Sequence, residues 1–296
     1  MMSALPNIPT VLITNDDGPP GEESPFIETF AAHLTAKLGW RVRVCIPAHQ
    51  RSWISKAILV NEPVHVTSHK KDWYLATGTP ASCVNIALHH LFSDIDLVIS
   101  GPNLGSNIGN TCALSSGTLG AAMEAALCGT KALALSFAFY NGDIAEPKLG
   151  NACRMAVDVI EKLWRKDAWE KAGASVFNVN VPLVEHTACP VFVTRMANGP
   201  GFGSLYKPVA DVDNLDGVNR ITGLPTKNVA VLDDAQAHAA EKDRVFVFSA
   251  PYVCDPQPEV GTDTWAIRLC AISVTPLRPE LRGIRSIGWT GDLEFQ

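Results

Sequence analysis

The chain has 296 residues, 47% of them hydrophobic, which is enough to bury the core of one large α/β domain. Its formal net charge is −6 and it has no basic run, so composition argues against a protein that binds nucleic acid polymers. The longest apolar segments are too short to cross a bilayer, and residues 1–10 lack the pattern of a secretory signal; we therefore expect no membrane partner.

The eight cysteines are scattered, and none belongs to a CxxC pair. Several lie inside apolar runs, as Cys45 does within residues 42–46. This pattern is typical of buried free thiols in a reducing compartment. We therefore expect a cytoplasmic protein, with the nucleus as the alternative.

A β-α-β unit opens the chain. Residues 10–14 form a short apolar run typical of a central parallel strand, and the turn formers of residues 15–21 follow it. Ser24-Pro25 predicts the N-cap and first residue of a helix, and Gly39 predicts its end. Residues 41–46 alternate polar and apolar side chains, which predicts a second strand. We expect the crossover between the strands to be right-handed.

Strands and helices continue to alternate through the middle of the chain. In order, the pattern predicts a helix from Thr79-Pro80, a strand at 96–100, a small-residue loop at 101–116, a helix at 117–127 closed by Gly129, a strand at 131–136, an amphipathic helix at 151–170 and a strand at 176–181. This alternation predicts an α/β fold with a doubly wound parallel sheet.

The composition and periodicity of the sequence change from about residue 191. Turn-forming residues become frequent and helical periodicity disappears, so we expect residues 198–243 to form an extended arm or hairpin excursion. Residues 244–248 and 265–274 read as strands that return to the core. We therefore expect one domain, with its core at about 8–197 and 244–278. Arms of this kind often exchange between subunits, which favours a homodimer or homotetramer.

Two adjacent aspartates, Asp16 and Asp17, directly follow the first strand. Consecutive strand side chains point to opposite faces, so the two converge only if the chain turns, as Gly18-Pro19-Pro20 suggests. Two carboxylates about 4 Å apart repel by about 4 kcal/mol at an effective dielectric near 20, which favours a cation between them. Carboxylate, amide and hydroxyl oxygens suit Mg²⁺, Mn²⁺ or Ca²⁺ better than Zn²⁺. The alternative is that Asp16 caps a turn and Asp17 faces solvent.

Residues 115–118, Ser-Ser-Gly-Thr, directly precede the predicted helix at 117–127. Backbone N–H groups at a helix start, together with hydroxyls, form an anion site, so this loop is a candidate phosphate site. The alternative is an ordinary Ser/Thr N-cap before a packed helix. No GxxxxGK[ST], GxSxG, GxGxxG or HExxH motif is present, which disfavours the enzyme classes that use them.

Seven stretches together resemble a known family. They are residues 13–18, 47–52, 78–81, 100–107, 115–124, 178–182 and 273–277. In this order and spacing they resemble the landmarks of the SurE survival-protein family of nucleotidases, over nearly the whole chain.

The resemblance implies a Rossmann-like core, a C-terminal arm used in oligomerisation, and metal-dependent 5′/3′-nucleotidase or broader acid phosphatase activity. It also implies one divalent metal per subunit, Mg²⁺ or Mn²⁺, with Ca²⁺ able to occupy the site. The implied metal ligands are Asp16, Asp17, Ser52 and Asn103. The implied phosphate-contacting residues are Asn107, Ser115, Ser116, Gly117 and Thr118. The sequence departs from the family pattern at residues 53–55 and at Pro102, which leaves the substrate preference open.

These expectations lead to a mechanistic hypothesis. Water activated by the metal attacks phosphorus, with Asp16 orienting or deprotonating that water. Asn107 and the loop at 115–118 stabilise the equatorial oxygens of a nucleoside monophosphate or another small phosphate ester. The main alternative is a non-catalytic nucleotide or metal sensor on the same fold. A nucleotide-sugar transferase is a third, weaker reading, because no second nucleoside-binding region is recognisable.

Overall fold

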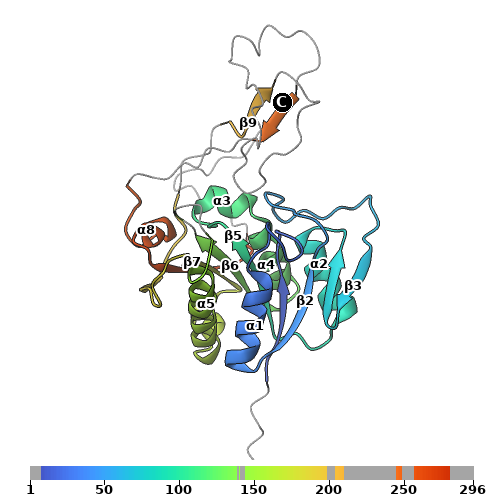
Figure 1. Ribbon diagram of the computed structural model, residues 1–296, viewed down its shortest axis with the longest axis horizontal. Coiled ribbons are helices and arrows are strands. Elements are labelled where there is room, and N and C mark those ends of the chain that lie inside the picture. Colours follow the sequence, from blue (N-terminus) through green and yellow to red (C-terminus); the bar gives the residue numbers. More distant parts are fainter. Residues whose placement is uncertain are drawn as a thin grey trace, which may run out of the picture.

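The computed structural model describes residues 8–138, 140, 144–198, 204–209, 245–248 and 257–280. Within these residues, one nine-stranded sheet lies between two layers of helices, and a two-stranded sheet stands apart from this body (Figure 1).

The large sheet is mixed, with a parallel centre. In spatial order its strands are β3 (Val66–Lys70), β4 (Trp73–Ala76), β2 (Arg41–Pro47), β1 (Thr10–Thr14), β5 (Leu97–Leu104), β6 (Lys131–Ala138), β7 (Val176–Pro182), β11 (Ile272–Leu277) and β8 (Val191–Val193). The strands from β4 to β7 are parallel. Strand β3 pairs antiparallel with β4, and β11 pairs antiparallel with β7. The doubly wound, mostly parallel sheet is therefore confirmed.

The helices cover both faces of this sheet. One face carries α1 (Ile27–Leu38), α5 (Lys148–Arg165) and α6 (Ala168–Ala172); the other carries α2 (Pro80–Ile86), a short π-helix at Ala87–Leu91, and α4 (Gly117–Leu127). Alternate residues of β1 enter different cores, because successive strand side chains point to opposite faces. Val11 and Ile13 belong to the core under α1 and α5, whereas Leu12 belongs to the core under α2 and α4.

Edge-to-face aromatic contacts attach the α5 layer to its neighbours. Trp164 of α5 lies 5.6 Å from Trp40 and 6.4 Å from Trp169 of α6, measured between ring centroids. Trp169 in turn lies 5.1 Å from Phe177 of β7. Such pairs contribute about 0.5–1.5 kcal/mol each beyond the area they bury, so they hold the helical layer in a fixed position on the sheet.

Two helix boundaries differ from those that the sequence predicted. Helix α1 begins at Ile27 and not at Pro25, because Ser24 is used in the preceding turn, where its Oγ accepts a hydrogen bond from Asn15 Nδ2 at 2.9 Å. The helix expected over 151–170 is two helices. Helix α5 ends at Arg165, and Asp167, with φ of 50°, interrupts the helical backbone before α6.

Two segments have a different type of structure from the one that the sequence predicts. The loop expected over 101–116 is largely regular, since β5 continues to Leu104 and helix α3 occupies Gly109–Ser115. The strand expected over 265–274 begins as helix α8 (Asp263–Arg268), and only its end lies in β11. Short apolar runs fit the periodicity of a strand and that of a helix. In the segment at 265–274 an N-cap favours the helix, because Thr262 Oγ1 accepts a hydrogen bond from Trp265 N at 3.3 Å.

The two-stranded sheet pairs β9 (Tyr206–Val209) antiparallel with β10 (Val245–Phe248). The predicted strand at 244–248 is therefore confirmed. Most of the arm expected over 198–243 lies outside the described residues, so the limits of the arm and of the domain stay predictions. Phe248 packs against Trp53, with ring centroids 5.0 Å apart, and this contact joins the small sheet to the loop that follows β2.

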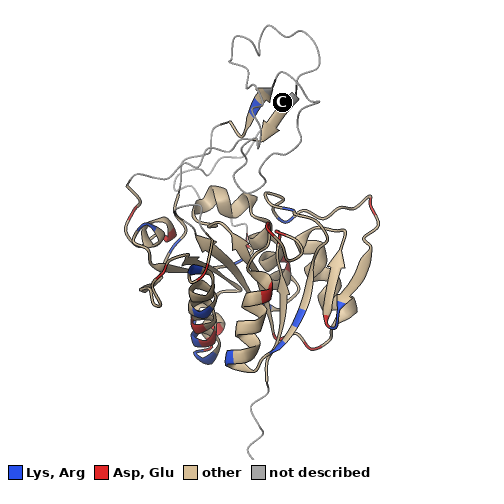
Figure 2. Cartoon of the chain, in the orientation of Figure 1, with Lys and Arg blue, Asp and Glu red and all other residues tan. Residues whose placement is uncertain are grey.

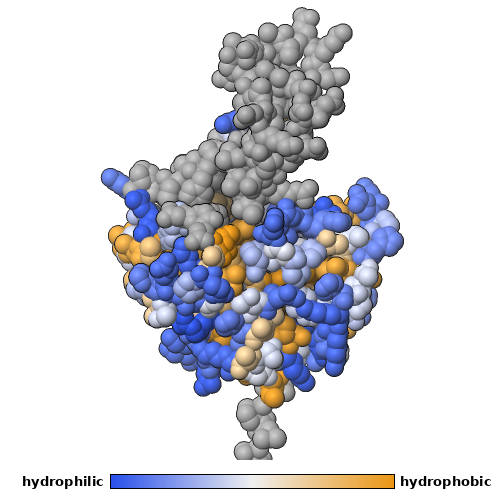
Figure 3. Space-filling view, viewed as in Figure 1, coloured by the Kyte–Doolittle hydropathy of each residue, from blue (hydrophilic) through white to orange (hydrophobic). Residues whose placement is uncertain are grey.

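The described surface has mixed charge. Figure 2 shows basic and acidic residues dispersed over the body and interspersed along α5. The face seen in Figure 3 is mostly hydrophilic, with small apolar areas between. No helix within the described ranges has the length and apolarity that a membrane span requires.

Candidate metal and phosphate site

The candidate site lies where β1, β2 and β5 end. Strand β1 is the parallel neighbour of both other strands, and Thr14, its last residue, pairs in register with Ser100 of β5. The carboxyl ends of parallel strands meet at one edge of a sheet, where open α/β folds bind their ligands. The loops that follow β1 and β2, and the end of β5, therefore come together.

The chain turns sharply after β1. Asn15 Nδ2 donates to the Gly18 carbonyl at 2.8 Å, and Gly18 N donates back to Asn15 Oδ1 at 3.2 Å. This turn removes Asp16 and Asp17 from the strand geometry that would separate their side chains. The turn predicted from Gly18 and its following prolines is confirmed.

Both aspartates are buried, Asp16 being 2% exposed and Asp17 5% exposed. Asp16 Oδ1 accepts a hydrogen bond from Thr118 Oγ1 at 2.7 Å, and Asp17 Oδ2 accepts one from Leu104 N at 2.9 Å. The alternative in which Asp17 faces solvent is therefore wrong.

The electrostatics of the pair are unfavourable as they stand. Burial raises the pKa of Asp16 to about 6, although hydrogen bonds from Thr118 oppose the shift. Burial and then the charge of Asp16 raise the pKa of Asp17 well above its ordinary value. No lysine, arginine or histidine in the described ranges forms an ion pair with either carboxylate. Buried charges without a partner are costly, so a bound cation fits this place.

The donors expected for such a cation include neutral oxygens. The described residues contain no cluster of three or more His, Cys, Asp or Glu side chains suited to a metal, so two carboxylates alone would not complete a site. The sequence neighbours of Ser52 and Asn103 contact the pair through their backbone N–H groups. Arg51 N donates to the Asp16 carbonyl at 2.7 Å, and Leu104 N donates to Asp17 Oδ2 at 2.9 Å. An all-oxygen set of this kind suits Mg²⁺, Mn²⁺ or Ca²⁺.

Asn103 and Ser52 are each held by a hydrogen bond. Asn103 Nδ2 donates to the Gly105 carbonyl at 2.6 Å, which leaves the amide oxygen as the atom that can face a cation. Gln50 Nε2 donates to Ser52 Oγ at 2.5 Å and fixes that side chain from within its own loop. Gln50 was not singled out from the sequence, because a glutamine in a polar loop carries no pattern of its own.

The loop at 115–118 caps helix α4. Ser116 Oγ accepts from Leu119 N at 3.1 Å, so the capping role expected as the alternative is confirmed for Ser116. Ser115 Oγ donates to the Thr111 carbonyl within α3 at 3.0 Å. The N–H groups of Gly117 and Thr118 are directed at the Asp16 carboxylate, where they lower its pKa. The positive end of α4 therefore already faces the Asp16 carboxylate. A phosphate would bind beside these amides or would share them with the aspartate.

Gly117 lets α4 approach the aspartate. A Cβ at this position would lie 2.8 Å from Asp16 Cβ, 2.9 Å from Asp16 Oδ2 and 3.1 Å from the Arg51 carbonyl oxygen. Any larger residue would push the aspartate or the Ser52 loop away, so the close approach of three segments depends on this glycine.

Asn107 lies under the site in a buried amide network. Its Nδ2 donates to Thr118 Oγ1 at 3.3 Å and to Ser136 Oγ at 2.9 Å. Its backbone N–H donates to Asn180 Oδ1 at 2.8 Å, and its carbonyl accepts from Asn178 Nδ2 at 2.8 Å. Both amide hydrogens of Asn107 are thus engaged within the protein, and its contact with phosphate stays a prediction.

Asn178 and Asn180 support Asn107, a role that the sequence pattern does not indicate. Both are fully buried in β7, among apolar neighbours. The signal that could have identified them is two asparagines at a spacing of two on a buried strand, because buried amides need specific partners.

Known proteins similar to this chain identify its family. The profile of the family described as "Survival protein SurE" matches residues 11–200. A 5′-nucleotidase SurE of Campylobacter lari is 35% identical over 58% of this chain and 66% of its own length. The 5′-nucleotidase SurE 1 of Burkholderia lata is 37% identical over 62% of this chain and 67% of its own length.

Two further similarities extend along nearly the whole chain. The SurE protein of Aquifex aeolicus has a similar solved structure, with a TM-score of 0.65, 26% identity and coverage of 93% of this chain and 95% of that one. A Saccharomyces cerevisiae protein named probable tubulin–tyrosine ligase PBY1 is 30% identical over 94% of this chain, but the chain spans only 42% of that protein. The chain belongs to the SurE family.

Proposed function

Since this chain is a member of the SurE family, we propose that it is a metal-dependent phosphomonoesterase. It hydrolyses nucleoside monophosphates, as a 5′/3′-nucleotidase, and other small phosphate esters. The observation that carries the proposal is the pair of buried carboxylates, Asp16 and Asp17, beside the start of α4, with no ion pair to a lysine, arginine or histidine among the residues that the structure describes. The names of the Campylobacter and Burkholderia relatives support the same activity.

We assign one divalent metal, Mg²⁺ or Mn²⁺, to Asp16, Asp17, Ser52 and Asn103, with Ca²⁺ able to occupy the same place. A divalent cation supplies positive charge to the phosphoryl oxygens and makes a bound water a better nucleophile. The chain contributes carboxylates that are held in position, because Thr118 and Leu104 each donate a hydrogen bond to one carboxylate oxygen.

In this mechanism Asp16 is the catalytic residue. Its Oδ1 accepts the Thr118 hydroxyl and keeps a second lone pair that the cation would use, so its Oδ2 is the atom that orients the attacking water and accepts its proton. The water oxygen bonds to phosphorus, the bond from phosphorus to the ester oxygen breaks, and the leaving oxygen takes a proton from solvent. Ser115, Ser116 and the amides of Gly117 and Thr118 stabilise the phosphoryl oxygens. Asn107 holds Thr118 in place from below.

A direct experiment tests the proposal. Phosphate release from AMP and from p-nitrophenyl phosphate is measured with Mn²⁺, with EDTA, and for Asp16→Asn. Asp94→Asn is the matched control, since Asp94 is a partly exposed aspartate outside the site. We expect EDTA and Asp16→Asn each to abolish turnover, and the control to retain it. Undiminished turnover in either case defeats the proposal, and Mn²⁺ binding without any turnover favours the sensor function instead.

We also propose a cytoplasmic location, with the nucleus as the alternative, and assembly as a homodimer or homotetramer through the arm. The free state of the seven described cysteines motivates the location. Imaging of the tagged full-length chain tests the location, and light scattering on the purified protein tests the assembly. A secreted protein or a monomer would contradict the respective proposal.

A further inference from the structure

The loop that carries Ser52 has an unusual backbone. Trp53 and Ser55 have φ of 61° and 54°, in the left-handed region that side chains other than glycine rarely occupy. Strained residues of this kind persist only where the surrounding structure over-determines them, and they concentrate at functional sites. Something outside the loop must therefore hold it in this conformation.

Hydrogen bonds made by the backbone of the loop fix it at three points. Arg51 N donates to the Asp16 carbonyl at 2.7 Å, and Ser55 N donates to the Ser115 carbonyl at 2.9 Å. Thr79 Oγ1, at the start of α2, donates to the Ala57 carbonyl at 2.6 Å. Ser52 lies between the first two of these points. Its position consequently depends on how closely the loop is held to the helices.

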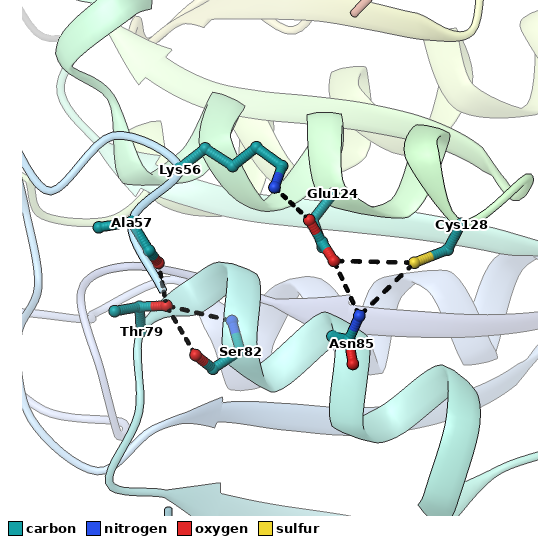
Figure 4. Close-up of polar contacts among 7 residues, drawn as sticks. All are labelled: Lys56, Ala57, Thr79, Ser82, Asn85, Glu124 and Cys128. Atoms are coloured by element: carbon teal, nitrogen blue, oxygen red, sulfur yellow. Dashed lines mark hydrogen bonds and ion pairs between the residues drawn. The ribbon is translucent and has the colours of Figure 1, made fainter. Parts of the chain in front are cut away.

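The loop and α4 touch backbone to backbone. A Cβ on Gly120 would lie 2.2 Å from the Ser55 carbonyl oxygen, so only glycine permits this contact. One turn further along α4, Glu124 forms an ion pair with Lys56 of the loop. Lys56 Nζ lies 2.5 Å from Glu124 Oε2, and the Glu124 side chain is only 10% exposed (Figure 4).

Glu124 is itself fixed from a third element. Asn85 Nδ2 of α2 donates to Glu124 Oε1 at 2.9 Å, and Cys128 Sγ lies 3.8 Å from the same oxygen (Figure 4). Burial alone would raise the pKa of the Glu124 carboxyl, but the hydrogen bonds from Lys56 and Asn85 outweigh it and lower that pKa. The carboxylate is therefore ionised and fully paired, and it joins the Ser52 loop to two helices.

We propose that Lys56 and Glu124 are positioning residues for the metal site, and the inference rests on the function proposed above. Helix α4 holds Asp16 at its N-terminus, through Thr118, and holds the Ser52 loop two turns later, through Glu124. A single rigid helix thus sets the separation of two metal donors that come from different strand-end loops. The Lys56–Glu124 ion pair keeps Ser52 within reach of the cation that Asp16 binds.

Metal affinity measured on the full chain without substrate tests the inference. Mn²⁺ binding is followed by calorimetry for wild type, Lys56→Met, Glu124→Gln, the double variant and Lys56→Arg. The matched control is Lys131→Met, because Lys131 is 34% exposed, as against 36% for Lys56, and pairs with Asp167 at 3.0 Å outside the site. Unfolding temperatures are recorded for every variant.

We expect Lys56→Met to weaken Mn²⁺ binding about tenfold, with Lys56→Arg close to wild type. The double variant should be no weaker than the worse single variant, because the two residues act as one unit. Lys131→Met should leave the Mn²⁺ affinity unchanged, because its ion pair with Asp167 lies outside the site. Unchanged Mn²⁺ affinity in Lys56→Met and Glu124→Gln, with lowered unfolding temperatures, overturns the inference and leaves a structural ion pair. Failure of the wild type itself to bind Mn²⁺ defeats the proposed function and the inference together.

Discussion

Replacing Gly117 by alanine isolates the close approach on which the site depends. The added Cβ would lie 2.8 Å from Asp16 Cβ, whereas ordinary contact begins at 3.4 Å, so the aspartate or the helix must move by about 0.6 Å. Asp16 cannot rotate away freely, because Thr118 holds its Oδ1 at 2.7 Å. The displaced group is the proposed catalytic carboxylate.

The expected effects on activity and stability differ in size. Misplacement of a reacting group by about 1 Å can lower a rate about 100-fold, so we expect Gly117→Ala to lower kcat/KM for AMP by about 10- to 100-fold. Overpacking costs about 1–3 kcal/mol, partly offset by the better helix propensity of alanine, so the free energy of unfolding should fall by about 1–2 kcal/mol.

Phosphate release with saturating Mn²⁺ and denaturant unfolding measure these two quantities. Gly150→Ala is the matched control, since Gly150 lies in the first turn of α5 and its Cβ would meet only the flexible end of Glu146, at 3.0 Å. The control should keep its activity and be as stable as wild type or more so. If Gly117→Ala keeps wild-type kcat/KM although its stability falls, the contact between α4 and Asp16 does not serve catalysis.

Three further predictions follow from single contacts. Asn107→Ala removes the hydrogen bonds to Thr118 and Ser136, so the free energy of unfolding should fall by about 1–3 kcal/mol and AMP turnover should fall with it. Unchanged values in denaturant unfolding and phosphate release would show that the buried network supports neither the fold nor the site. The Asp263 carboxylate accepts hydrogen bonds from Gly109 N at 2.9 Å and from Ala197 N at 2.9 Å. Asp263→Asn leaves only one acceptor oxygen, so thermal unfolding should occur at a lower temperature. An unchanged unfolding temperature would show that these hydrogen bonds do not stabilise the fold. The pKa of Glu124 is lowered in the folded protein, so the stabilisation that its carboxylate provides is present above the ordinary value of 4.5 and is lost as pH falls through the lowered pKa. The difference in unfolding temperature between wild type and Glu124→Gln should therefore shrink below pH 4.5. A difference that stays constant would exclude the ion pair as the source of the stabilisation.

Several features of the candidate site were readable from local sequence. Asp16 and Asp17 follow an apolar run and precede a cluster of turn formers, which places them at a strand end. Ser116 stands directly before an alanine-rich helix and caps it in the structure. These features are local, because each depends on neighbours within a few residues along the chain.

The errors arose where local patterns fit more than one structure. Strands β3 and β4 were not predicted, because β3 is largely exposed and shows no regular apolar alternation. The apolar run around Trp265 fits a strand or a helix, and the N-cap at Thr262 decides in favour of the helix. Ser24 has the chemistry of an N-cap but is used by Asn15, a partner that only the folded turn brings near.

The sequence by itself determined the alternation of strands and helices, the parallel centre of the sheet, and the loops that form the candidate site, because periodicity and turn chemistry act over short distances. Only the tertiary structure decided which atoms meet there. Thr118 donates to Asp16, and Lys56 pairs with Glu124, across long separations in the chain. Such contacts exist because parallel strands bring the ends of distant segments to one edge of the sheet, and burial then requires each polar group to find a specific partner.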